Sequence, residues 1–130
     1  MNFIIVKTSK RIESVNITSK VEALISSKGK GIVFLYVPHT TAGIFINESA
    51  DPDVALDINN KLSELVPYGS GYHHFEGNSD SHIKSVIVGN QLFVFFEEGK
   101  LFLGRWGGIF FAEFDGPRER KLYYKILENI

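Results

Sequence analysis

Residues 31–38, Gly-Ile-Val-Phe-Leu-Tyr-Val-Pro, restrict the fold of this chain more than any other segment. They form a continuous apolar run with the length of a buried β-strand, and a proline closes it. Similar runs recur along the chain, and Gly99 and the glycines between 104 and 108 mark hairpin turns or bends among them. Strands therefore dominate the expected fold.

The apolar runs predict about eight strands and two helices. The segments with strand character are 2–7, 12–17, 31–38, 41–47, 83–88, 91–97, 101–103, 109–114 and 122–127. Thr18 is the expected N-cap of a first helix that stops at Gly29, and Asp51-Pro52 begins a second helix that ends near Pro67. This order predicts an α+β domain in which a mixed, mostly antiparallel sheet curls into a barrel or packed sheets.

Length and composition favour a single soluble domain over residues 1–130. A chain of 130 residues is one domain by the usual length, and its net charge of -1 offers no global field for nucleic acid or an anionic membrane. It has no cysteine, which excludes disulfides and thiolate chemistry. The N-terminus lacks the pattern of a signal peptide, and no apolar run is long enough to span a bilayer. We expect a cytoplasmic protein with neither a nucleic-acid nor a membrane partner.

Three of the four histidines lie in the window 72–82, which also contains Glu-Gly-Asn-Ser-Asp. Residues 67–80 read as a long loop, and loops of that length in a compact domain are usually functional or disordered. The aromatic and histidine content favours function. His82 is expected at the junction between this loop and the next strand.

Imidazoles in this pattern indicate a metal or proton-transfer site. His39 ends the apolar run 31–38, so His39, His74 and His82 converge if their segments are neighbours, and three histidines suit zinc or a similar metal. Glu76 and Asp80 would orient imidazoles or bind metal. The alternative is that these are ordinary histidines satisfied by water. His73 is interpreted as structural.

Two further polar stretches could hold an anion. Thr40 and Thr41 follow His39 at a turn, where hydroxyls and backbone N–H groups can hold phosphate. Composition alone favours a plain turn, in which the two threonines bond their own backbone. Arg118 follows Asp115-Gly116-Pro117 and could pin a phosphate bidentately. Arg120, Lys121 and Lys84 could add positive charge there, but Arg120 and Lys121 are interpreted as a solvated basic turn. Trp106 is interpreted as a core residue.

Four motifs in consistent order resemble the YjbQ-like family. They are PHTTAGIFINE at 38–48, DPDV at 51–54, HFEGNSDSHIKS at 74–85 and GRWGGIFFAEFDGPR at 104–118. The resemblance implies a compact α+β fold with a closed, mixed β-barrel and a trimeric assembly. It also implies the family's usual label, a secondary thiamine-phosphate synthase, which joins a pyrimidine pyrophosphate to a thiazole phosphate and releases pyrophosphate.

The matching motifs imply the site residues. His39, His74 and His82 would hold a divalent metal, zinc or magnesium, with Glu76, Asp80 and Arg118 as catalytic groups. The substrate-binding positions would be Thr40, Thr41, Asn78, Glu113 and Asp115.

The leading hypothesis is metal-assisted transfer on a small phosphorylated metabolite, as a main or a weak side activity. The alternatives are a module that binds a metal or phosphorylated metabolite without turnover, and a metal-dependent hydrolase. A homotrimer is expected because the Phe-rich strands offer more apolar surface than a small domain easily buries. The phenylalanines concerned are Phe93, Phe95, Phe96, Phe102, Phe110, Phe111 and Phe114.

Overall fold

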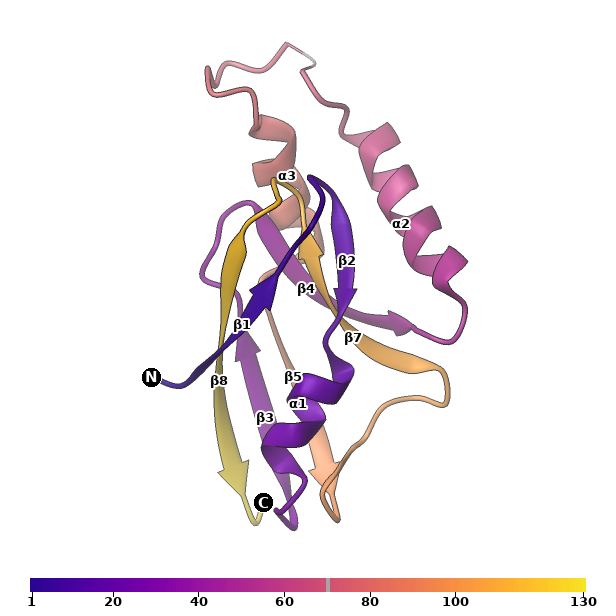
Figure 1. Cartoon of the computed structure of the whole chain (residues 1–130), viewed down its shortest axis with the longest axis vertical. Helices are drawn as coiled ribbons and strands as arrows, with labels where there is room; N and C mark the ends of the chain where they lie inside the picture. The colour runs from indigo at the N-terminus through magenta and orange to yellow at the C-terminus, as the bar shows by residue number, and fades with distance from the viewer. Residues whose placement is uncertain (70) are drawn as a thin grey trace.

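The computed structural model describes residues 1–69 and 71–130 and shows two antiparallel sheets with three helices (Figure 1). The elements are β1 (Phe3–Lys7), β2 (Glu13–Asn16), α1 (Thr18–Ile25), β3 (Lys30–Tyr36), β4 (Ala42–Glu48), α2 (Pro52–Leu65), α3 (Ser79–Val88), β5 (Gln91–Glu97), β6 (Lys100–Leu101), β7 (Gly107–Glu113) and β8 (Glu119–Glu128). The predicted α+β class with about eight strands is confirmed.

The strands form a five-stranded sheet in the order β1-β8-β3-β5-β6 and a three-stranded sheet in the order β2-β7-β4. Every strand pair in the described residues is antiparallel. The expected curled sheet is therefore present as two sheets, not as the single closed, mixed barrel that the resemblance implies. Both sheets turn one face to a shared core.

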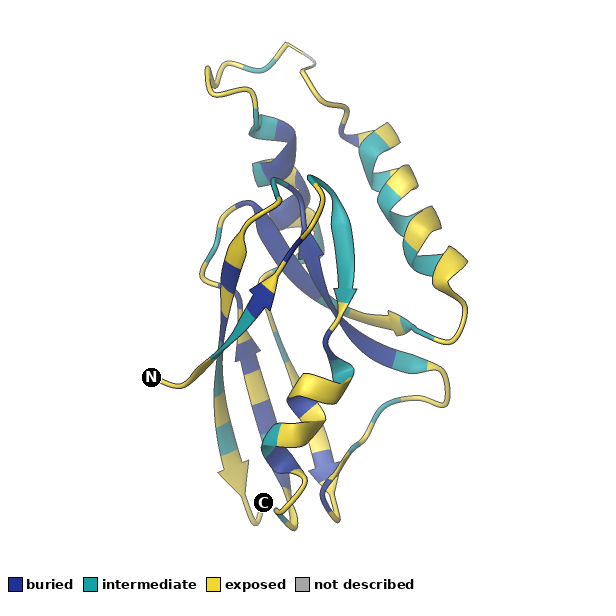
Figure 2. Cartoon of the chain, viewed as in Figure 1, coloured by how far each residue is buried: buried dark blue, intermediate teal, exposed yellow. Residues whose placement is uncertain are grey.

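Alternation along the strands builds that core. In β3, Val33 and Leu35 are buried while Phe34 and Tyr36 face outward, and Figure 2 shows the same banding along the strands. Val94 and Phe96 of β5 complete the inner layer. Burying each side chain of this size stabilises the fold by about 1.5–3 kcal/mol.

Helix α1 packs on the core through Val21 and Ile25. The predicted N-cap was wrong by one position, because Ile17 occupies the cap and Thr18 is the first helical residue. The hydroxyl of Thr18 instead accepts a hydrogen bond from the Ile109 N–H at 2.9 Å. That bond fastens the start of α1 to β7.

Helix α2 begins and ends where the sequence predicts. The Asp51 side chain accepts a hydrogen bond from the Asp53 N–H at 2.9 Å, and the helix ends at Leu65, two residues before Pro67. No residue of α2 is buried, and the helix stands at the margin of the body in Figure 2. Trp106, expected in the core, is also 54% exposed.

Helix α3 replaces the strand predicted at 83–88. Its buried residues are Asp80, Ser81, Lys84 and Ser85, which share one helical face. Ile83, Val86 and Ile87 face outward. The prediction failed because the β-branched residues favour a strand and the buried face is polar, so the helical period was hidden in the apolar pattern. No helix of the described chain is long and apolar enough to cross a membrane.

Candidate functional site

One polar pocket gathers most of the residues that the sequence singled out. It has a volume of about 350 Å³ and lies where the β3–β4 connection, the start of α3 and the β7–β8 turn meet. Its lining residues are Pro38, His39, Thr40, Thr41, Glu76, Asn78, His82, Asp115, Arg118 and Arg120. We call it the histidine–arginine pocket.

His39 lies in the pocket with a neutral imidazole, which accepts a hydrogen bond at one nitrogen and can donate from the other. Its Nε2 accepts a hydrogen bond from the Lys121 N–H at 2.9 Å. Burial lowers the pKa of His39, and the nearby charge of Arg120 lowers it further. A neutral imidazole that accepts at Nε2 carries its proton on Nδ1, so Nδ1–H is the group that His39 can offer to a ligand.

His82 brings the other histidines to the same region. It stands on α3 and not at the expected loop–strand junction, and it lines the pocket together with His39. The His74 and His82 rings lie edge to face with centroids 5.5 Å apart, and His74 Nε2 is 3.8 Å from Glu76 Oε1. His73 and His74 line an adjoining hollow that also reaches His82.

The predicted metal ligands surround this region without forming a ligand set. Among residues 1–69 and 71–130, no group of three or more His, Asp or Glu side chains is arranged to hold a metal ion. His39 already uses its Nε2 lone pair on Lys121. His74 and His82, with Glu76 beside them, are the positions best placed to receive an ion.

A buried ion pair brings one of its two members, Arg120, to the lining of the pocket. Glu113 and Arg120 have side chains that are 0% and 2% exposed, and Arg120 Nε donates to Glu113 Oε1 at 2.8 Å. The Glu113 carboxylate also accepts from the Thr8 hydroxyl and from the Asp115 N–H. Burial opposes the charge of Glu113, but the hydrogen bonds from Arg120 and these groups outweigh it and lower its pKa. Arg120, predicted to be solvated, is instead a core residue.

This arrangement changes the role of Glu113. Both carboxylate oxygens are held by protein donors, so Glu113 positions Arg120 and does not face a substrate. Arg120 Nη2 in turn donates to the Thr41 hydroxyl at 2.9 Å. Thr41 is thereby fixed at the pocket wall.

A second buried charge cluster supports the start of α3. Asp80 is wholly buried and accepts from Arg11 Nη2 at 3.0 Å and from Lys84 Nζ at 3.2 Å. These bonds overcome the effect of burial and lower the pKa of Asp80, and the bond to Asp80 raises the pKa of Arg11. An enclosed, doubly paired carboxylate is unsuited to exchange protons with a substrate, so Asp80 acts here as a positioning group.

Asp115 ties the two clusters together. Its Oδ2 accepts from Asn78 Nδ2 at 2.9 Å and from Arg118 Nη2 at 3.1 Å, and its Oδ1 is 4.0 Å from Arg11 Nε. The Arg118 guanidinium is half exposed and held over the pocket by these contacts. Asn78 Oδ1 is enclosed and has no donor among the described residues.

Sequence reasoning missed Arg11 as part of the site, and it gave Lys84 and Arg120 only as possible added positive charge. Only the fold places each of these three basic residues beside a buried carboxylate. Arg120 and Leu122 are two residues apart in β8, so both side chains point to the same, inward face. That spacing is the signal that could have identified Arg120 as buried.

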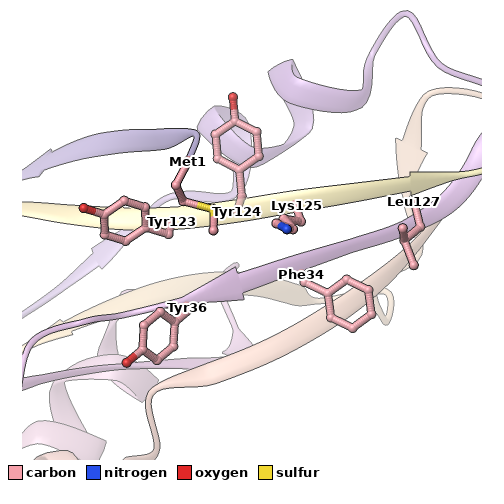
Figure 3. Close-up of a pocket in the computed structure, with 7 residues that line it drawn as sticks. All are labelled: Met1, Phe34, Tyr36, Tyr123, Tyr124, Lys125 and Leu127. Atoms are coloured by element: carbon pink, nitrogen blue, oxygen red, sulfur yellow. The ribbon is translucent and has the colours of Figure 1, made fainter.

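A separate apolar groove of about 620 Å³ lies on the outer face of the five-stranded sheet. Figure 3 shows its side chains, which come mainly from the neighbouring strands β3 and β8. The lining residues are Met1, Phe34, Tyr36, Tyr123, Tyr124, Lys125 and Leu127. With a single charged residue in its lining, the groove is unlike the histidine–arginine pocket.

Comparison with protein families gives a match over nearly the whole chain. Residues 2–129 match the family described as UPF0047 protein YjbQ-like. UPF0047 protein MJ1081 of Methanocaldococcus jannaschii is 56% identical over 124 residues, 94% of this chain and 90% of that protein. UPF0047 protein YugU of Bacillus subtilis is 47% identical over 125 residues, 94% of this chain and 95% of that protein.

Solved structures agree in fold. An uncharacterised conserved protein of the YjbQ/UPF0047 family from Clostridium acetobutylicum superposes with a TM-score of 0.93 at 44% identity, over 98% of this chain and 100% of that chain. A conserved hypothetical protein from Thermus thermophilus gives a TM-score of 0.93 at 45% identity, with the same coverage. The names of these four proteins state no activity.

Proposed function

We propose that this chain, which belongs to the YjbQ-like UPF0047 family, is a transferase that acts on a small phosphorylated metabolite in the histidine–arginine pocket. The reaction would be of the thiamine-phosphate synthase type, as a main or side activity. A single observation carries the proposal: segments far apart in sequence bring His39, Arg118 and Arg120 to one pocket. Such a set of fixed donors suits a phosphate or pyrophosphate group.

The chemistry asks for charge stabilisation more than for proton transfer. The thiazole nitrogen supplies an electron pair to the methylene carbon of the pyrimidine, and the carbon–oxygen bond breaks with its pair leaving on pyrophosphate. Arg118 and Arg120 would neutralise the leaving group, and His39 Nδ1–H would donate to it. Because no proton is exchanged, the pairing of Asp80 and Glu113 is no obstacle.

We also propose, as a separate point, that the site binds the divalent metal predicted from the sequence. His74 and His82 would hold it, with Glu76 beside them. The described residues as arranged do not form a complete ligand set, so the roles assigned to Arg118, Arg120 and His39 do not depend on an ion. When bound, zinc or magnesium would supply further neutralisation of pyrophosphate charge.

The test is direct product formation. The full chain is incubated with the pyrimidine pyrophosphate, the thiazole phosphate and magnesium, and thiamine phosphate is quantified against a protein-free blank. Arg118→Met should lower the product rate by about tenfold or more, since one charged hydrogen bond to the leaving group is lost. Arg105→Met is the matched control, because Arg105 is exposed and stacks on Trp106 away from the pocket. Product at the level of the blank would refute the transferase.

A binding module without turnover is the second candidate. The observation that favours it is the fixed donor set of His39, Arg118 and Arg120, which can hold an anion whether or not a reaction follows. The pairing of the carboxylates of Asp80, Glu113 and Asp115 argues against the hydrolase alternative, since hydrolysis needs a group that activates water. Calorimetric binding of pyrophosphate with no product would favour the module.

We also propose a homotrimer, with the outer face of the five-stranded sheet as the surface between subunits. Cross-strand register places Phe34 beside Phe93 and Tyr36 beside Tyr123 on that face. Phe93, Phe95 and Phe102 are 53%, 50% and 73% exposed, whereas Phe96, Phe110, Phe111 and Phe114 are buried. A contiguous aromatic face of this kind marks an association surface. A cytoplasmic location, which is expected from the sequence, is likewise a proposal.

A further inference from the structure

We propose that Arg120 anchors a terminal phosphoryl group through Nη1, and that its surroundings select phosphoryl groups over carboxylates. The proposal rests on the proposed function and deepens it by naming the anchoring atom and the ligand class. The sequence offered Arg120 only as possible added positive charge beside Arg118, and the names of related proteins assign it no role.

The guanidinium of Arg120 is fixed on all sides but one. Nε donates to Glu113 Oε1, and Nη2 donates to Glu113 Oε2, to the Thr41 hydroxyl and to the Thr41 carbonyl. Nη1 makes no hydrogen bond to the described residues. Among those residues, the only fully enclosed side-chain atom without a partner is Asn78 Oδ1, so Nη1 is accessible. Because Arg120 lines the pocket, Nη1 is the atom that it presents there.

This geometry is that of a prepared anion site. The side chain is only 2% exposed, so little water screens its charge. A hydrogen bond from Arg120 to an anion is therefore stronger than it would be at the surface. Glu113 and Thr41 hold the plane of the guanidinium in place before any ligand arrives. Little side-chain entropy is left to lose on binding.

The bonding pattern also discriminates between anions. A carboxylate is bound best by two parallel N–H groups from one edge of an arginine. An arginine has two such edges, Nε with Nη2 and Nη1 with Nη2. At Arg120 neither edge is free, because Glu113 binds Nε and Nη2, and Thr41 also binds Nη2. A phosphoryl group has three oxygens directed apart, which can accept separately from Arg120 Nη1, His39 Nδ1 and Arg118.

The experiment measures binding by isothermal calorimetry to the full chain, with inorganic pyrophosphate and malonate as probes. Wild type should bind pyrophosphate at least about tenfold more tightly than malonate, and Arg120→Lys should weaken pyrophosphate about tenfold or more. Arg105→Lys is the matched control and should bind as wild type does. Equal affinity for the two probes, no pyrophosphate binding by wild type, or unchanged binding by folded Arg120→Lys would overturn the proposal.

A further variant covers the case in which Arg120→Lys does not fold. Arg120→Met combined with Glu113→Gln removes both charges together and leaves no unpaired buried ion. Its pyrophosphate affinity should fall by at least as much as that of Arg120→Lys, with thermal unfolding recorded for each protein. Wild-type affinity in the folded double variant would equally overturn the anchor.

The product assay separates this proposal from the transferase. Pyrophosphate binding that depends on Arg120, without thiamine phosphate, refutes the transferase and supports the anchor. Thiamine phosphate formation with binding that is indifferent to Arg120 refutes the anchor alone.

Discussion

Glu113 and Arg120 join the two sheets of the molecule through one buried ion pair. Glu113 ends β7 of the three-stranded sheet, and Arg120 lies in β8 of the five-stranded sheet. The pair is enclosed, and hydrogen bonds from Thr8 and to Thr41 surround it. One interaction thus joins the two sheets and positions Arg120 at the histidine–arginine pocket.

Glu113→Ala should therefore destabilise the protein strongly. It leaves the Arg120 charge buried without its partner, and breaking such a pair costs about 3–5 kcal/mol. Urea unfolding followed by circular dichroism measures the loss. Glu13→Ala is the control, since Glu13 bonds locally to Ser9 at the surface. A loss in Glu113→Ala no greater than in the control would contradict the structural role.

Acid should unfold the protein through Asp80 and Glu113. Both have folded-state pKa values below their ordinary ones, because hydrogen bonds from Arg11 and Lys84, and from Arg120, outweigh burial. Their contribution is present in full above the unfolded-state pKa of about 4 and is lost as pH falls through the lower folded-state values. The free energy of unfolding from urea titrations should drop below about pH 4. Asp80→Asn should flatten that drop, and an equally steep drop in the variant would exclude Asp80 as its source.

Gly43, in the His-Thr-Thr-Ala-Gly motif, should resist substitution for a packing reason. A Cβ at this position would lie 2.7 Å from the Gly89 carbonyl oxygen and 3.0 Å from Val88 Cγ1, at the end of α3. Gly43→Ala should displace α3 from β4 and cost about 1–3 kcal/mol. Gly29→Ala is the matched control, because nothing lies within 4 Å of its Cβ position. Thermal unfolding of the two variants side by side makes the comparison, and equal midpoints would refute the close contact.

The fold was predictable from sequence wherever a continuous apolar run or a capping pair marks an element. The apolar run at 31–38 predicted β3, and Asp51-Pro52 predicted the start of α2. Helix α3 reverses the usual pattern by burying Lys84 among other polar groups, so its apolar residues pointed to a strand.

The site was predictable only in part, for a related reason. His39, Thr41 and Arg118 belong to polar stretches that interrupt strands, and such stretches stand out in a sequence. Alternation with Leu122 indicates that Arg120 points inward, but no local pattern pairs it with Glu113. Arg11 lies in a turn that is far from Asp80 in the sequence, so their contact also depends on long-range packing.

The aromatic sheet face should control assembly. Phe93→Lys places a charge in the centre of the outward face, where Phe93 contacts the rings of Phe34 and Phe95. If this face lies between subunits, sedimentation should show a shift from trimer to monomer at micromolar concentration with the far-UV spectrum retained. Glu22→Lys on the exposed side of α1 should leave the wild-type mass. A wild-type protein that is already monomeric would refute the trimer, and a Phe93→Lys trimer would refute this surface.

His39 should report on anion binding through its own titration. Burial and the charge of Arg120 hold its pKa below the ordinary value of about 6.5, and the Lys121 N–H keeps Nε2 as an acceptor. An anion in the pocket favours the protonated imidazole, so pyrophosphate should raise the pKa of His39, and by linkage pyrophosphate should bind more tightly as pH falls through that range. Histidine-selective NMR titration with and without pyrophosphate measures both effects, and His39→Gln identifies the resonance. A His39 midpoint that does not move while pyrophosphate is shown by calorimetry to bind would place the anion outside this pocket.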